Sequence, residues 1–179
     1  MHPINKIVLF SSALLSLISS PVVPAQTASP ERQKEISERG SHVMPFELAQ
    51  TQHIFSKTET GGRQQVIARD PNNSEQITLI RRHLTQIAGE FARGDFSGPE
   101  KIHGQAMPGL AALRAAKPGQ LHVQYKDLPD GAEITYSAQD QPLITAIHQW
   151  FDAQLSDHGP DAAPGMDHGT MGISHKNTC

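Results

Sequence analysis

The fold is decided by the stretch Leu121-His-Val-Gln-Tyr-Lys-Asp-Leu-Pro-Asp-Gly-Ala-Glu-Ile-Thr-Tyr-Ser-Ala138. Polar and apolar residues alternate on both sides of Asp130-Gly131, and an Asp-Gly pair between two alternating runs is a strong signal for a β-hairpin. Because strand side chains alternate between faces, one face of this hairpin is apolar and carries Leu121, Val123, Tyr125, Ile134 and Tyr136. The opposite, polar face carries His122, Gln124, Glu133 and Thr135.

A similar unit precedes this hairpin. Two β-type runs, Thr51–Thr58 and Gln64–Arg69, flank Gly61-Gly62. A helix-type run follows each hairpin, with Ser74 and Asp140 as the expected N-caps. The apolar residues of these runs recur every three or four positions: Ile77, Ile80, Leu84, Ile87 and Phe91 in the first, and Ile144, Ile147, Phe151 and Leu155 in the second. We therefore expect an α+β fold, with a four-stranded antiparallel sheet from two hairpin-helix units and the helices on one face.

The two ends of the chain differ from this unit in composition. Residues 1–25 combine Lys6, an apolar stretch and the small residues Val23-Pro24-Ala25, a pattern typical of a cleaved secretory signal peptide. We expect residues 26–40 to be a linker, 41–159 the α+β domain, and 160–179 a flexible tail containing His and Met. No second apolar run follows, so we expect a periplasmic or secreted protein without membrane insertion after cleavage.

Charge, cysteine content and missing motifs exclude several classes of function. The formal net charge is −3 and the 15 Lys and Arg residues are scattered, unlike the basic surface that nucleic-acid binding requires. The single cysteine, Cys179, allows no internal disulfide. Gly-x-Ser-x-Gly, phosphate-loop and His-Glu-x-x-His motifs are absent, so the sequence gives little support for an enzyme.

Histidine and methionine lie close together in four places. The pairs are His42/Met44 and His103/Met107 in loops of the domain, and Met166/His168 and Met171/His175 in the tail. Imidazole together with thioether is the ligand set expected for copper, especially Cu(I). We therefore predict a core copper site, with His53 as an additional ligand, and a low-affinity collecting strand in the tail. The metal ligands are His42, Met44, His53, His103 and Met107 in the core, and Met166, His168, Met171 and His175 in the tail.

The local backbone decides whether each core pair can act together. His42 and Met44 point the same way if the chain around them is extended. His103 and Met107 share one face if the segment from Ile102 is helical. The alternative is that the methionines fill the core and the histidines order their loops by hydrogen bonding.

Two further functions stay open beside metal binding. A non-catalytic module would bind a small molecule or a protein through the polar sheet face described above. A small hydrolase or transferase would be centred on His103, with Asp95 or Glu100 as its acid–base partner.

Seven short motifs are spread across residues 42–159: His42-Val-Met-Pro-Phe46, Thr51-Gln-His-Ile-Phe55, Gly94-Asp-Phe96, Ile102-His-Gly104, Met107-Pro-Gly-Leu110, Leu128-Pro-Asp-Gly-Ala132 and Trp150-Phe-Asp-Ala-Gln-Leu155. Together they resemble a family of small exported bacterial proteins of unsettled function, often named aspartate carbamoyltransferase. The Ser-Thr-Arg-Thr and His-Pro-Thr-Gln segments that true carbamoyltransferases share are absent, so we do not expect that activity. The tail resembles the Met-Asp-His-Gly repeats of exported bacterial copper-resistance proteins, which implies copper binding.

Overall fold

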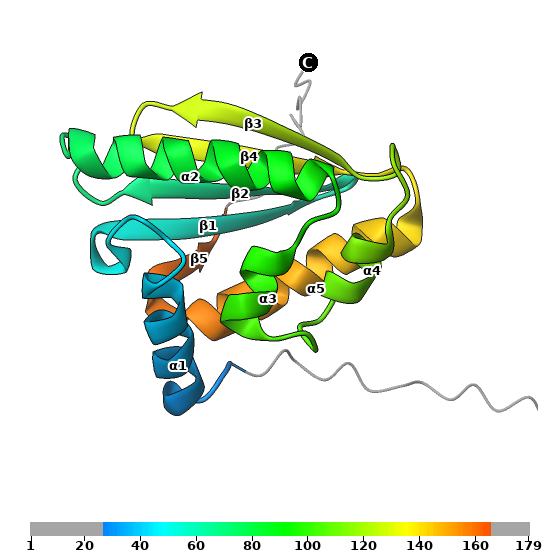
Figure 1. Ribbon diagram of the computed structural model, residues 1–179, viewed down its shortest axis with the longest axis horizontal. Coiled ribbons are helices and arrows are strands. Elements are labelled where there is room, and N and C mark those ends of the chain that lie inside the picture. Colours follow the sequence, from blue (N-terminus) through cyan, green and yellow to red (C-terminus); the bar gives the residue numbers. More distant parts are fainter. Residues whose placement is uncertain (1–26, 166–179) are drawn as a thin grey trace, which may run out of the picture.

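The computed structural model describes residues 27–165 (Figure 1). Within them the chain forms an α+β fold, as expected, with an open five-stranded mixed sheet. No helix in this part of the chain is both long and apolar enough to span a membrane. The predicted signal peptide (1–25) and the tail positions Met166, His168, Met171 and His175 lie outside the described residues.

The elements follow one another in the order α1 (Pro30–Ser41), η1 (Leu48–Gln50), β1 (Thr51–Thr58), β2 (Gly61–Ala68), α2 (Ser74–Ala92), α3 (Ser97–His103), α4 (Leu110–Ala115), β3 (His122–Leu128), β4 (Gly131–Ser137), α5 (Gln141–His158), η2 (Gly159–Asp161) and β5 (Ala162–Pro164). The labels η1 and η2 denote short 3-10 helices.

The four expected strands pair antiparallel in the order β3-β4-β2-β1, with Tyr125 opposite Ile134. Strand β5 adds a fifth, parallel to β1, and this corrects both the four-stranded sheet and the expectation of a flexible tail from residue 160. The sequence does not indicate this strand, because Ala162-Ala163-Pro164 is too short to show alternation. Its proline lacks an N–H group and therefore fits at the edge of a sheet, where β5 lies.

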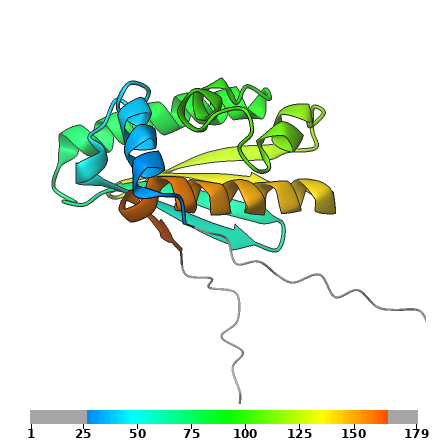
Figure 2. The same ribbon diagram turned by 90° about the horizontal axis from the view of Figure 1, so that it is seen from below.

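The core lies on the sheet face where α2 and α5 pack. Phe55, Val66, Ile134 and Tyr136 join one buried cluster with apolar residues of both helices. Helix α2 lies mainly over β3 and β4, and α5 over β1, β2 and β5, so each long helix covers mostly the hairpin of the other unit. Figure 2 shows α2 along one side of the molecule and α5 running across the sheet.

Helix α1 corrects the expectation that residues 26–40 form a linker. Ser29 caps the helix by accepting a hydrogen bond from the Arg32 amide, and Pro30 at the first position favours the helical φ. Ile36 is fully buried, and Arg32 forms an ion pair with Asp157 of α5. The mostly charged segment shows no apolar periodicity, yet one buried isoleucine and the ion pair hold it against α3 and α5.

The connection between the two units brings the end of α3 to the end of α5. Helix α3 stops at His103, because Gly104 takes a φ of +90° that helical residues do not adopt. Gly109 then packs directly on α5, where an added Cβ would lie 2.1 Å from the carbonyl oxygen of Ala146. Figure 1 shows α3 placed between α1, α2 and α5 as a result.

Candidate functional site

A small, partly open cavity lined mostly by buried residues lies between the sheet and helices α2, α3 and α5. Its volume is about 50 Å³. Such a space accommodates an ion or one or two water molecules, whereas organic ligands occupy pockets of roughly 300 Å³ or more. The walls are mainly apolar, but imidazole, thioether and amide groups also line the cavity: Met44, His53, Gln64, His83, His103, Gln154 and His158.

His53 belongs to β1, whose alternation turns the side chain to the core, where it is 4% exposed. Its ring centroid lies 5.9 Å from that of Phe46, 6.4 Å from that of Phe55 and 5.0 Å from that of His158. Burial lowers the pKa of His53 to about 4, although the backbone of Asp161 acts in the opposite direction. The ring is therefore neutral at neutral pH, and its Nδ1 atom makes no hydrogen bond.

His158 is the last residue of α5 and connects the other two buried imidazoles. Its ring centroid lies 5.0 Å from that of His53 and 5.1 Å from that of His103. Burial lowers the pKa of His158 well below its usual value, and the neighbouring His53 and His103 act in the same direction. His53 of β1, His103 of α3 and His158 of α5 thus form one buried group, which we call the histidine cluster.

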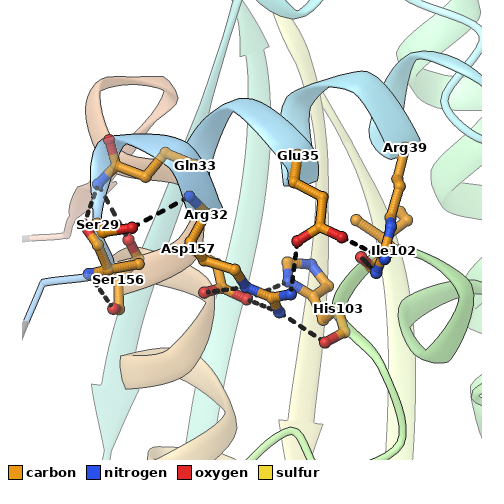
Figure 3. A network of polar contacts seen from close by, with 10 residues as sticks. Ser29, Arg32, Gln33, Glu35, Arg39, Ile102, His103, Ser156 and Asp157 are labelled. Carbon is orange, nitrogen blue, oxygen red and sulfur yellow. Dashed lines mark hydrogen bonds and ion pairs between the residues drawn. The ribbon is translucent and has the colours of Figure 1, made fainter.

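The side chain of His103 is 1% exposed and is fixed by charged partners on one edge of its ring. Its Nδ1 atom lies 2.8 Å from Asp157 Oδ2. Arg32 of α1 donates two hydrogen bonds to the same carboxylate, at 3.0 and 3.3 Å, and a third to the His103 carbonyl oxygen at 2.6 Å. Figure 3 shows this network, in which α1 connects the ends of α3 and α5.

The protonation of Asp157 decides which nitrogen of His103 is free. Burial raises the pKa of Asp157, but hydrogen bonds from His103 and Arg32 outweigh burial and hold that pKa below its usual value. An ionised carboxylate only accepts hydrogen bonds, so Nδ1 of His103 carries a proton and donates it. In the neutral ring, Nε2 then keeps its lone pair. Carboxylates orient metal-binding histidines in proteins in the same way.

The structure brings three predicted site residues together around the cavity: Met44, His53 and His103. Met44 is 8% exposed. His42 does not join them, since it is exposed and lines a separate groove. The condition of an extended segment is not met, because His42 caps α1 with helical φ and ψ of −88° and −14°, and the Met44 amide still donates to the Gly40 carbonyl.

Met107 also lies outside the cavity. It is 6% exposed and lines a groove on the outer side of His103. The condition for a shared i, i+4 face is not met, because α3 ends at His103 and Gly104 interrupts the helix. Met107 belongs to the hydrophobic core. Filling the core is the role that the methionines have in the alternative to metal binding.

Sequence reasoning missed His158 and Asp157. His158 follows Trp150 and Gln154 at four-residue steps on the buried face of α5. Continuing that four-residue spacing from Trp150 would have placed His158 in the core. The same spacing from Phe151 leads to Leu155, which is half-buried. Asp157 gave no signal, since a single acidic residue near a helix end is ordinarily a surface group.

The two acidic partners expected for His103 are engaged elsewhere, and this corrects the acid–base hypothesis. Asp95 accepts a hydrogen bond from the backbone at the start of α3. Glu100 forms an ion pair with Arg114 at 3.1 Å. His103 pairs with Asp157 instead.

The polar sheet face has the composition expected from the alternation. Gln124 lies opposite Thr135 in the β3–β4 register, and His122 and Gln124 are exposed. Glu133 already accepts a hydrogen bond from Gln65 at 2.8 Å, so its carboxylate has a partner within the sheet.

No group of three or more His, Cys, Asp or Glu side chains in residues 27–165 is arranged to hold a metal ion. The nitrogens of the histidine cluster therefore do not meet at one point in these ring orientations. Comparisons of the chain with protein-family models, curated proteins and solved structures gave no match. The family resemblance, and the copper binding that the tail motif implies, therefore stay predictions.

Proposed function

We propose that the protein is an exported copper-binding protein that acts in copper tolerance or delivery, with a buried site formed by the histidine cluster and Met44. The observation that carries the proposal is the presence of three imidazoles and one thioether around one small cavity. In this ligand set His158 takes the place of His42 and Met107.

The protonation of the imidazoles supports ligation at neutral pH. A metal ion needs neutral imidazole, so a protonated ring would have to lose its proton first. The lowered pKa values of His53 and His158 keep both rings neutral. Asp157 holds the proton of His103 on Nδ1, which leaves Nε2 for a ligand.

The chemistry of the donors favours Cu(I) over harder ions. Thioether sulfur is a soft ligand that selects Cu(I), whereas Mg²⁺ and Ca²⁺ prefer oxygen ligands. The described residues that line the cavity include no carboxylate. A site of neutral donors with apolar walls suits a singly charged ion better than a doubly charged one, because less charge is buried.

The spacing of the rings supports a shared ion. A metal bonded to two imidazole nitrogens at about 2 Å, at a tetrahedral angle, places the ring centroids about 5 Å apart. The cluster has separations of 5.0 and 5.1 Å. Rotation about the side-chain torsions, without movement of the backbone, would then turn the nitrogens toward one point. His53 Nδ1 is buried without a hydrogen bond, so a metal ion could satisfy this atom.

Anaerobic titration of the mature chain with Cu(I), against a chelator of known affinity, tests the proposal. We expect tight binding that is lost in His53→Ala and in His158→Ala, while His122→Ala, an exposed histidine on β3, binds normally. A chain that ends at Gly165 separates the core site from the predicted tail ligands. Absence of binding rejects the function, and binding that survives both cluster substitutions in the shortened chain rejects the site.

A further inference from the structure

Two surface grooves border the cavity, and they share different residues with it. The first, of about 530 Å³, lies between the segment after α1, helix α2 and helix α3, and shares Val43, His83, Ile87 and Gly98 with the cavity. The second, of about 650 Å³, lies beside α5 and shares only His103 with the cavity. We call them the His83 groove and the His103 groove.

The His103 groove is separated from the cavity by the charged network. The His103 and Asp157 side chains are 1% and 14% exposed, and Arg32 bonds to both residues. An ion passing this way would have to break the contacts that orient the His103 ring. Opening a partly buried ion pair leaves its charges without partners, which is costly.

The His83 groove meets the cavity through uncharged groups. His83, on α2, is half-buried and lines both spaces. Its ring meets that of Phe46 edge-on at a centroid distance of 5.7 Å, and Phe46 lies 5.9 Å from His53. The Phe46 ring therefore neighbours both an imidazole at the groove and an imidazole of the histidine cluster. His42 is exposed further out in the same groove.

We propose that the His83 groove is the route by which Cu(I) reaches and leaves the cavity, with His83 as a transient ligand at its inner end. This inference rests on the proposed function. His42 and His83 bind the ion in turn, and a shift of Phe46 lets His53 replace His83. Each step is a ligand exchange in which one copper–nitrogen bond breaks as another forms, so no electron is transferred and no further reactant is needed.

Gly98 offers a direct way to close this route. An added Cβ at Gly98 meets no atom within 4 Å, and Gly98 lines both the groove and the cavity, so a substitution here adds bulk where the two spaces meet. Ala106 is the matched position in the His103 groove, where it is exposed. Gly98→Phe and Ala106→Phe therefore introduce the same side chain into the two different grooves.

Stopped-flow transfer of Cu(I) between the full mature chain and a chromogenic chelator measures the rates, and equilibrium competition measures the Kd. We expect Gly98→Phe to slow both uptake and release by at least about tenfold with an unchanged Kd, and Ala106→Phe to change neither rate by more than about twofold. His83→Leu should also slow transfer, and His83→Met, which restores a soft ligand, should recover it.

The possible results of these measurements test the proposed copper route and the proposed copper-binding function separately. Normal Kd with wild-type rates in Gly98→Phe and His83→Leu overturns the route and leaves the copper site intact. Slower transfer in Ala106→Phe alone overturns it in favour of the His103 groove. Absence of Cu(I) binding in every protein, wild type included, overturns the proposed function together with the route.

Discussion

Lowering the pH from 7 to 5 should destabilise the metal-free protein, because the buried His53 resists protonation that the unfolded chain accepts. Its pKa is about 4 in the folded protein and about 6.5 in an unfolded chain. Between these values the unfolded state binds more protons, so the free energy of unfolding falls as the pH falls through this window. At pH values well above about 6.5 neither state is protonated, and the effect vanishes.

The size of the effect follows from these two pKa values. His53 alone should lower the free energy of unfolding by about 2 kcal/mol between pH 7 and pH 5. The lowered pKa of His158 acts in the same direction and adds to the loss. The steepest dependence should therefore lie between about pH 6.5 and pH 4.

Urea unfolding at a series of pH values, with a chelator present, measures this dependence. His53→Gln should reduce the slope, whatever its effect on stability at pH 7, because glutamine does not titrate. His122→Gln, which removes an exposed histidine from β3, should keep the wild-type slope. Equal slopes in the wild type and His53→Gln would refute the argument that burial keeps this ring neutral.

Three further predictions concern the supports of the site. Asp157→Asn should weaken Cu(I) binding by about 10- to 100-fold without changing the stoichiometry. Asp152→Asn, in the same groove, should bind Cu(I) normally, and equal affinities of the two variants would show that Asp157 does not position the His103 ring. Gly109→Ala should lower the free energy of unfolding by at least about 1 kcal/mol in urea, since its Cβ would meet the Ala146 carbonyl oxygen. A chain that ends at Gly165 should lose weakly bound copper in equilibrium dialysis and keep the tight site, and loss of the tight site would place it in the tail.

The strands and long helices could be predicted because their signals are local. Asp130-Gly131 between alternating runs sets the second hairpin, and the spacing of Ile77, Ile80 and Leu84 sets α2. Strand β5 and the packing of helix α1 could not be predicted, because each depends on contacts with distant parts of the chain, although Ser29 and Pro30 are local signals for the start of α1. Arg32 needs Asp157, and Ala162 needs the free edge of β1.

The site was predictable in residue type and only partly in position. Met44, His53 and His103 line one cavity, but the sequence gives no sign that the end of α1 turns His42 outward. The direction of His42 depends on how the end of α1 is capped. Whether the backbone at the cap is helical or extended depends in turn on packing beyond the cap. His158 could have been found by continuing the buried face of α5 by one turn.

We propose that the histidine cluster and Met44 bind Cu(I) together. X-ray absorption of a copper-loaded chain that ends at Gly165 tests it most directly, because imidazole nitrogen and thioether sulfur scatter differently. We predict two or three nitrogen ligands and one sulfur, with the sulfur lost in Met44→Leu and kept in Met107→Leu. A copper environment without sulfur, or one whose sulfur persists in Met44→Leu, would show that the histidine cluster and Met44 do not bind Cu(I) together.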